Sequence, residues 1–494
     1  MNNYSILHLS DLHRISDENI DCLLSSFEIE KSKYAEEGIS APHFIVVSGD
    51  IVQGSKSDDA AKAKKEIQTQ YVTASRFLSS MADMFLEGDR NRIIIVPGNH
   101  DVSQYVSKSC FANVEMPTAQ KNTKEFNKEI RELCLKLQES DNLVRWSWKE
   151  LCFKKVSNKD LYDTRFCDFI DFYNNFYSGD RTYPIEYDRQ SQVIEFPMFN
   201  VTFVCLNSCY HLDHLNESGY ISPKSLSLLT KELLQQKSKG RLIIAVWHHH
   251  TSGRPKESNY LDNSILDNIV ENGVQLVLHG HQHVSGIVNC YKDVFTENKL
   301  WLVSAGTLYG NRSDVVTGNT RQYNILEVVE EDNKCSIKLR SRVDNTLLNE
   351  TPVWVPENVG RSNEKQYPIE ITPHAKTYNE EESNKRQLAE ILQDVEVSGD
   401  FKTAINRLES LDTKKPEVRM FILDYAQRID DTATILRYFT NPANTKEAIA
   451  VLDVIERTKD KKAFVSLIKS EYIQTCQDAI VRDLLANVKH LIKI

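Results

Sequence analysis

Five short apolar runs in the N-terminal part of the chain each end in residues whose side chains bind metal ions. The runs lie at residues 4–9, 44–48, 93–96, 242–246 and 274–278, and they have the length and composition of buried strands. The polar clusters that follow are D-L-H at 11–13, G-D at 49–50, G-N-H-D at 98–101, H-H-H at 248–250 and H-G-H-Q-H at 279–283. Because α/β sheets build their sites beyond the carboxyl ends of strands, these clusters are expected to meet.

The residue types in the clusters suit a divalent metal ion. Imidazole, carboxylate and amide oxygen occur together without a thiolate, which favours Mn, Fe, Zn or a similar ion. A spacing of two, as in Asp11 and His13 or His281 and His283, places both side chains on one face of a strand end. A single D-x-H or G-D cluster would be weak evidence because short motifs match by chance, but five in order are not expected by chance.

The remaining pattern of the first 350 residues is also that of an α/β or β-sandwich core. Further apolar runs at 201–206 and 301–304 predict buried strands, and residues 322–329 and 335–343 predict a late hairpin. Helical periodicity is seen at 59–85 and 223–237.

The chain has 494 residues, which is too many for one ordinary domain. Residues 104–180, rich in charge and aromatics, are predicted to be a helical cap inserted into a domain at 1–350, with helices at 123–138 and 164–177. The proline-containing stretch 351–378 is typical of an extended linker. Residues 379–494 are helical throughout in pattern, which favours short antiparallel helix pairs stacked like a solenoid.

Composition excludes some classes of protein. The net charge is -10, which is not the footprint of a protein that binds nucleic acid over its whole surface. No signal peptide and no run of about 18 apolar residues is seen, so we expect no membrane segment. The ten cysteines form no C-x-x-C pair, and reduced thiols in the cytoplasm are expected.

The series D-x-H, G-D, G-N-H-D, a later H-H, and G-H-x-H resembles the calcineurin-like metallophosphoesterase superfamily over residues 1 to about 345. The resemblance implies a hydrolase with a four-layer α/β/β/α sandwich and metals at the strand ends. The helical insertion and the separate all-α C-terminal domain are additions to that fold. Many members have proline after H-H, whereas His250 and Thr251 follow here, so the resemblance does not reach a named subfamily.

Carried over by motif, the resemblance implies seven metal ligands. One ion would be held by Asp11, His13 and His283. The other would be held by Asn99, His248 and His281. Asp50 would bridge the pair, and His248 is chosen over His249 because the family's ligand follows its strand directly. Two such ions, about 3.5–4 Å apart, would clamp a phosphate and activate a bridging hydroxide. Mn²⁺ is the preferred metal, with Fe, Zn, Ni and Mg as alternatives.

The resemblance gives the rest of G-N-H-D a role other than metal binding. His100 would stabilise the transition state or protonate the leaving oxygen. Asp101 would orient His100 or set its charge. His8 and His279 lie inside apolar runs, which favours packing roles for both.

The substrate expected by analogy is a phosphodiester of a nucleotide or nucleic acid. SbcD-type nucleases and class III cyclic-nucleotide phosphodiesterases are the two competing comparisons. The alternatives are a phosphomonoesterase or protein phosphatase, and a scaffold that keeps the fold without hydrolysis.

Two further regions bear on the substrate and on partners. The aromatic residues of the insertion, Trp148 and Phe172 among them, favour a packed core over a base-stacking platform. Arg165 and Arg254 are candidates to reach a phosphate. The C-terminal helices are expected to bind a protein partner or self-associate rather than clamp nucleic acid, because they contain no basic run.

Overall fold

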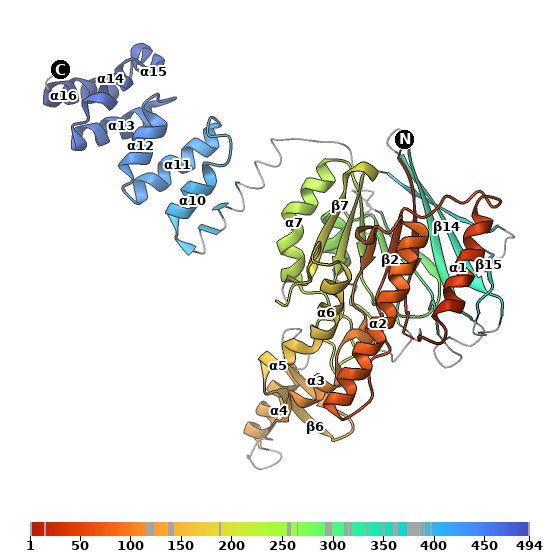
Figure 1. The fold of residues 1–494 in the computed structure, drawn as a ribbon. Helices are drawn as coiled ribbons and strands as arrows, with labels where there is room; N and C mark the ends of the chain where they lie inside the picture. The colour runs from red at the N-terminus through yellow and green to blue at the C-terminus, as the bar shows by residue number, and fades with distance from the viewer. Residues whose placement is uncertain are drawn as a thin grey trace. The chain divides into compact units, whose positions relative to one another are not determined.

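The computed structural model forms two compact units, Met1–Thr377 and Tyr378–Ile494 (Figure 1). It describes residues 2–13, 16–114, 123–136, 143–186, 189–253, 258–263, 265–291, 299–310, 315, 319–331, 334–346, 348, 351–358, 364–372, 388, 391–392, 394–395 and 398–492.

A seven-stranded sheet forms the first half of the N-terminal unit. Its strand order is β15-β14-β13-β1-β2-β3, and β16 also pairs with β14. β1, β2 and β3 are parallel, whereas β13 and β14 run antiparallel to their neighbours. The strands are β1 (Asn2–Leu9), β2 (Phe44–Val47), β3 (Ile93–Ile95), β13 (Gln322–Glu331), β14 (Lys334–Asp344), β15 (Trp354–Pro356) and β16 (Tyr367–Ile371).

A six-stranded sheet in the order β11-β12-β10-β9-β8-β7 forms the second half. The four central strands, β12, β10, β9 and β8, are parallel. The strands are β7 (Ser191–Phe196), β8 (Val201–Leu206), β9 (Leu242–Val246), β10 (Leu276–His279), β11 (Gly286–Tyr291) and β12 (Lys299–Ser304). Every apolar run that predicted a strand therefore forms one, with bounds shifted by at most a few residues.

Alternation of side chains along the strands produces four layers. Tyr4 and Ile6 of β1 point into the core between the two sheets, while Leu7 and Leu9 point into the core under the helices. α1 (Ile20–Tyr34) and α2 (Ala60–Phe85) cover the seven-stranded sheet. α7 (Pro223–Ser238) and α8 (Ile265–Glu271) cover the other. The predicted α/β/β/α sandwich is confirmed.

The two long helices begin where the sequence supplies a capping side chain. The carboxylate of Asp59 accepts a hydrogen bond from the backbone N of Lys62 at 2.8 Å and starts α2. Ser222 does the same for Ser225, and Pro223 occupies the first turn of α7. Each such cap contributes about 1 kcal/mol.

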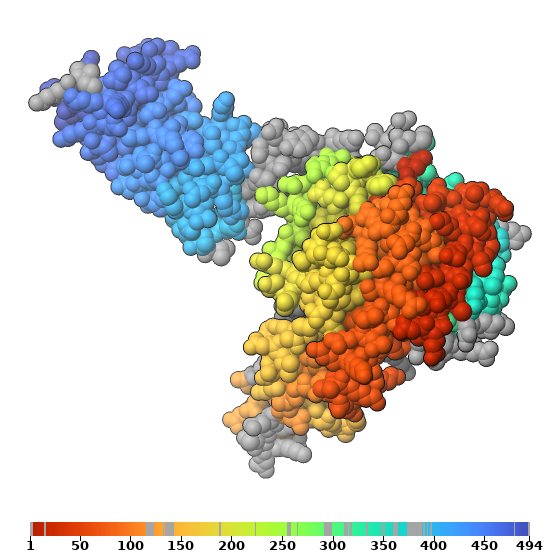
Figure 2. Space-filling view, in the orientation of Figure 1, coloured from red at the N-terminus to blue at the C-terminus, as the bar shows by residue number. Residues whose placement is uncertain are grey.

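The insertion is mixed rather than helical, which corrects the prediction. A three-stranded antiparallel sheet in the order β4-β6-β5 joins the helices because residues 144–156 form a tight hairpin with Trp146 paired to Phe153. Figures 1 and 2 show the insertion as a lobe at one end of the unit. Its elements are α3 (Gln104–Ser109), β4 (Phe111–Asn113), α4 (Lys124–Lys136), β5 (Val144–Ser147), β6 (Cys152–Val156), α5 (Lys159–Asp163) and α6 (Cys167–Phe176).

The stretch predicted as a linker contributes two strands to the first sheet, so that prediction needs correction too. β15 and β16 both pair with β14, and they occupy successive parts of its edge. Pro356 ends β15, and Pro368 lies in β16 at the outer edge of the sheet, where a missing backbone N–H is tolerated.

The C-terminal unit is all-helical and has its own core, as the periodicity predicted. Successive helices pack on one another, and α16 packs back on α13. Its arginines are drawn into ion pairs, such as Arg419 with Glu447, and the expectation of a protein partner or self-association here remains a prediction. The helices are α10 (Phe401–Leu408), α11 (Pro416–Arg428), α12 (Thr432–Phe439), α13 (Thr445–Thr458), α14 (Lys461–Ile468), α15 (Glu471–Thr475) and α16 (Ala479–Ile492).

No helix in the described part of the chain has both the length and the apolarity that crossing a lipid bilayer requires.

Candidate metal centre

The polar clusters at the ends of β1, β2, β3, β9 and β10 meet at one place. Ligand atoms of Asp11, His13 and His283 lie within 4.8 Å of one another, and those of Asp11, Asp50 and His248 do the same. These strands come from both sheets, so the site lies where the carboxyl ends of the two parallel sets face each other.

One part of the site gathers around Asp11. Its Oδ1 lies 3.2 Å from Nε2 of His283, and its Oδ2 accepts a hydrogen bond from the backbone N of His281 at 3.3 Å. The ring of His13 packs edge-on against that of His283, with 5.3 Å between centroids. The structure thus brings together the three residues that the sequence assigned to the first ion.

The other part gathers around Asn99. Its Oδ1 lies 2.9 Å from Nε2 of His248 and 3.0 Å from Nδ1 of His281, and these two nitrogens are 3.3 Å apart. Oδ2 of Asp50 lies 3.4 Å from the same Nε2 of His248. Asp50 therefore borders both groups, because one of its oxygens also lies within 4.8 Å of ring nitrogens of His13 and His100.

The choice between neighbouring histidines at the end of β9 can now be examined. His248 points at Asn99 and Asp50, whereas Nδ1 of His249 lies 2.9 Å from Oγ of Ser208. The serine hydroxyl also accepts the backbone N–H groups of both histidines. The geometry thus favours His248 as the ligand, and His249 as a packed neighbour.

Four of the predicted ligands have a backbone conformation that residues other than glycine rarely adopt. Positive φ angles occur at Asp11 (56°), Asp50 (54°), His281 (78°) and His283 (56°). Only eleven described residues besides glycine share this conformation, so its concentration at the strand ends is informative. Such conformations cost on the order of 1 kcal/mol or more and cluster where function requires them.

Two glycines allow the strand ends to approach. A Cβ atom at Gly98 would lie 2.2 Å from both the backbone N and Oδ1 of Asp50. A Cβ at Gly280 would lie 1.8 Å from Oγ of Ser10 and 2.8 Å from Oδ2 of Asp11. The close contacts around Asp50 and Asp11 therefore require glycine at both positions.

Replacing Gly98 with alanine is expected to displace Asp50 and to weaken metal binding at least about tenfold, since changes around a ligand typically cost 10- to 100-fold. Overpacking should also lower the free energy of unfolding by about 1–3 kcal/mol. Metal titration followed by calorimetry and thermal unfolding measure the two effects. Gly399→Ala, where a Cβ meets no atom within 4 Å although φ is 67°, is the control for metal affinity alone and should leave it unchanged; equal affinity in both variants would contradict the tight fit.

The donor set fits metal ions. Nδ1 of His248 lies 2.8 Å from the carbonyl oxygen of Ser48, which directs Nε2 at the oxygens of Asp50 and Asn99, where a metal ion would replace the proton on Nε2. Both ring nitrogens of His13 are buried and have no hydrogen-bond partner in the described structure, and Nδ1 of His281 faces Oδ1 of Asn99. A cluster of acceptors facing one another is stabilised by a cation placed among them.

The electrostatics of the site agree with this. Burial alone would lower the pKa of His248, but the carboxylate of Asp50 raises it to about 9. Burial would raise the pKa of Asp11, yet His283 lowers it to about 2. Burial lowers the pKa of His13 and of His281 to about 4, which keeps both imidazoles neutral and ready to bind a metal. The site therefore attracts positive charge.

His100 and Asp101 form hydrogen bonds with other groups rather than with each other. Nδ1 of His100 lies 2.9 Å from the carbonyl oxygen of Gln53, so a backbone group orients the ring. The carboxylate of Asp101 instead accepts from the backbone N atoms of Gly98 and Ile51 and from the hydroxyl of Tyr71. Asp101 therefore does not orient His100 by a direct hydrogen bond but joins the ends of β2 and β3 to α2, and its expected influence on the charge of His100 stays a prediction. Burial and the nearby Asp50 raise the pKa of Asp101 to about 7.

Sequence reasoning missed the groups that support the ligands. Tyr71 lies in the middle of α2, and Gln53 and Ser48 act through backbone carbonyls, so none of them has a local sequence signal. Thr307, whose hydroxyl donates to the carbonyl of Asp11 at 3.0 Å, was also missed. The one sequence signal for Thr307 was its position as a polar residue shortly after the apolar run at 301–304.

Arg165 does not serve a phosphate in this structure. Its guanidinium is buried and donates to the backbone carbonyls of Tyr162, Tyr210 and Leu212. Arg254, the other basic candidate, lies outside the described residues. His8 and His279 are buried within strands, as predicted, and Nε2 of His8 lies 3.0 Å from Oγ of Ser48.

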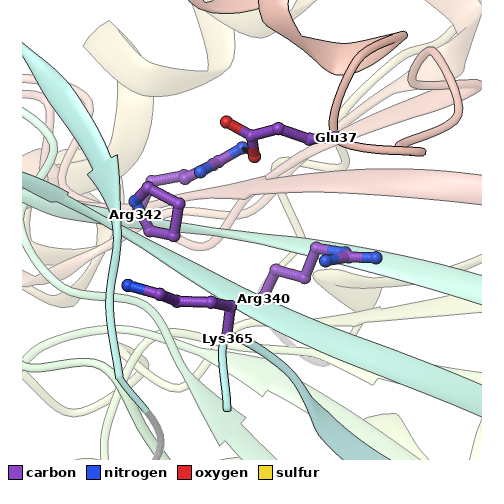
Figure 3. A pocket seen from close by; sticks show the side chains of 5 residues that line it. Glu37, Arg340, Arg342 and Lys365 are labelled. Atoms are coloured by element: carbon purple, nitrogen blue, oxygen red, sulfur yellow. Dashed lines mark hydrogen bonds and ion pairs between the residues drawn. The ribbon is translucent and has the colours of Figure 1, made fainter. Parts of the chain in front are cut away.

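A separate charged pocket lies at β14 (Figure 3), and its arginines form ion pairs that stabilise the fold. Arg342 forms ion pairs with Glu30 and Glu37, and Arg340 forms one with Glu327 at 2.9 Å. The Arg342 pairs join β14 to α1 and the loop after it, and the Arg340 pair joins β14 to β13, so most of the positive charge is already neutralised. The lining residues are Glu37, Arg340, Arg342, Pro356 and Lys365.

Comparison with known proteins now adds to this geometry. Solved structures with similar folds include a dimetal phosphatase from Danio rerio (10% identity, TM-score 0.35, 76% of this chain and 100% of that one) and a purple acid phosphatase from yellow lupin (9%, 0.35, 68% and 51%). A third is the calcineurin-like phosphoesterase YfkN from Bacillus subtilis (13%, 0.27, 67% and 86%). No curated protein matches the sequence.

The family model described as calcineurin-like phosphoesterase matches residues 4–285, which is more than half of the chain and includes all five polar clusters. Its members act on phosphate esters and typically bind two divalent metals, and the Asp/His clusters here are able to hold a metal. The resemblance seen in the sequence is confirmed, and the chain belongs to the calcineurin-like phosphoesterase family.

Proposed function

We propose that this protein hydrolyses a phosphodiester of a nucleotide or nucleic acid with two divalent metal ions. The observation that carries the proposal is the convergence of the strand-end ligands around Asp50, which borders both groups of candidate ligands. Asp11, His13 and His283 would hold one ion, Asn99, His248 and His281 the other, and Asp50 both. Bound ions at such a site supply Lewis acidity and make water a strong nucleophile near neutral pH.

His100 is proposed as the group that acts on the leaving oxygen. Its side chain is 33% exposed, whereas those of Asp50 and His248 are 2% and 0% exposed, so substrate can reach it. Donation from Nδ1 to the carbonyl of Gln53 would fix the ring and direct Nε2, which lies 3.9 Å from Oδ2 of Asp50, toward the site. A proton on Nε2 could be given to the departing oxygen.

The charge of the site favours a diester over a monoester. The charged groups with the largest influence on the pKa values of Asp11, Asp50 and His13 are histidines and aspartates. Among the described residues, no lysine or arginine appears with these histidines and aspartates as a group that influences the three pKa values. A monoester dianion carries one more negative charge than a diester and therefore has the greater need for such a cation.

Two alternatives remain open to experiment. A phosphomonoesterase or protein phosphatase would use the same metals, and a scaffold would keep the fold without turnover. The retention of every predicted ligand and of His100 around one site supports an enzyme over a scaffold.

The test compares two chromogenic esters. With Mn²⁺ added, bis-p-nitrophenyl phosphate is expected to be hydrolysed with a higher kcat/KM than p-nitrophenyl phosphate. Preference for the monoester would reverse the choice of substrate class, and no turnover of either by metal-loaded protein would overturn the proposed enzyme. Single-stranded DNA, double-stranded DNA, RNA and cyclic nucleotides then separate the diester substrates.

A further inference from the structure

The tip of the β5–β6 hairpin in the insertion presents a large aromatic side chain to solvent. Trp148 is 82% exposed, although most aromatic residues of the insertion, such as Phe166, Phe169 and Tyr173, are buried as predicted. Leu151, at the other end of the same turn, is 69% exposed and has a positive φ of 51°. An exposed indole on a projecting turn indicates a contact site.

The hairpin beneath Trp148 is fixed in place. The ring of Trp148 packs edge-on against that of Trp146, with 5.9 Å between centroids, and Trp146 packs against Phe153 with 4.8 Å between centroids. On the opposite face, buried Arg145 pairs with Asp213 at 2.9 Å. A ligand that stacks on Trp148 would therefore meet a platform that is already ordered, which reduces the entropy lost on binding.

The hairpin differs in charge from the rest of the protein. Residues 144–156 contain four basic residues and one acidic residue, whereas the whole chain has a net charge of -10. Lys154 and Lys159 are engaged by Glu150 and Asp163, and Arg145 is engaged as above. Exposed Lys149 and Lys155 form no ion pair within the described residues.

The arrangement of these groups matches one class of ligand. Lys155 shares a face of the hairpin with Phe153 and Trp146 because alternate residues of a strand point the same way. Exposed aromatic rings beside unpaired cations bind single-stranded nucleic acid, in which bases stack and phosphates need positive charge. A protein partner would be expected to prefer an apolar contact with fewer lysines, since lysine is depleted in protein interfaces.

The hairpin also belongs to the part of the chain that borders the metal site. α3 begins three residues after Asp101, and the backbone N of Ser103 donates to the carbonyl of Arg165, which closes the base of the insertion. Oγ of Ser107 in α3 lies 2.8 Å from Nδ1 of His214, in the loop that follows β8.

We propose that Trp148, with Lys149 and Lys155, binds an unpaired nucleobase and its flanking phosphates on a single-stranded nucleic acid. The identity of this ligand as substrate rests on the function proposed above. The binding itself requires neither the metals nor hydrolysis.

The experiment measures anisotropy of a fluorescein-labelled single-stranded oligothymidylate with the full chain in EDTA. Trp148→Ala is expected to weaken binding at least about fivefold, and Trp148→Phe to retain most of it, because one stacked base contributes about 1–3 kcal/mol. Met198→Ala removes a side chain that is 88% exposed outside the insertion and serves as the control. Replacing Lys149 and Lys155 with alanine should reduce the salt dependence of binding.

Equal affinity of wild-type protein and Trp148→Ala, or the absence of binding by wild-type protein, would overturn the inference. Loss of self-association in Trp148→Ala, seen by light scattering without loss of oligonucleotide binding, would assign the tip to a second copy and also overturn it. The control Met198→Ala should hydrolyse bis-p-nitrophenyl phosphate like wild-type protein, which shows that the preparation is folded. Binding that depends on Trp148 in a protein that hydrolyses neither ester would contradict the proposed function and leave this inference standing.

Discussion

Asp50→Asn is expected to abolish phosphoester hydrolysis, lowering kcat/KM by at least about 10³-fold. The amide keeps the size of the side chain and can still accept the 2.8 Å hydrogen bond from the backbone N of His100, so the fold should survive. It loses the charge that borders both groups of ligands, and the effect should exceed the 10- to 100-fold cost of losing a residue that only supports a ligand.

The measurement combines initial rates on bis-p-nitrophenyl phosphate with metal content by mass spectrometry. Metal content should fall together with activity. Asp21→Asn makes the same chemical change at a side chain that is 81% exposed on α1, and it should behave like wild-type protein. Near-normal turnover by Asp50→Asn would sink the assignment of Asp50 as the shared ligand.

His100→Ala is expected to slow turnover by about 10²- to 10⁴-fold while both metals remain bound. His100 lies beside Asp50 and His13 but is not one of the seven predicted ligands, and its ring is oriented by the carbonyl of Gln53, so removing the ring should not empty the site. His490→Ala, at an exposed residue of α16 in the other unit, is the control.

The choice of leaving group tests what His100 does. A p-nitrophenolate departs without a proton, whereas a nucleoside alkoxide needs one. If His100 is the general acid, the loss should be much larger for a dinucleotide than for bis-p-nitrophenyl phosphate. Equal losses would indicate electrostatic stabilisation instead, and loss of metal from His100→Ala would show that the role proposed for His100 is wrong.

The sequence predicted the core strands and the meeting of their polar ends because both depend on local pattern. The run at 242–246 is apolar throughout and that at 201–206 contains one threonine, and both are buried on both faces, as in a central strand of a parallel sheet. The predicted ligands follow their strands within a few residues, so the strands determine where these side chains lie. For this reason Asp11, Asp50 and His248 could be named as neighbours before any contact was known.

The rest could not be predicted because it depends on contacts between distant segments. Strands β15 and β16 form by pairing with the edge of β14, whereas the prolines of this stretch predicted an extended linker. The family motif assigned Asp101 to His100, whereas its partners are the backbone of Gly98 and the distant Tyr71 and Ile51, which are 30 and 50 residues away. Exposure of Trp148 likewise could not be read from a stretch in which most aromatic residues are buried.

The most direct test of a two-metal centre is a crystal of the Mn²⁺-loaded protein examined by anomalous scattering at the manganese edge. We predict two peaks about 3.5–4 Å apart on either side of the Asp50 carboxylate, one near Asp11, His13 and His283, and the other near Asn99, His248 and His281. A single peak, or peaks away from Asp50, would contradict the proposed centre.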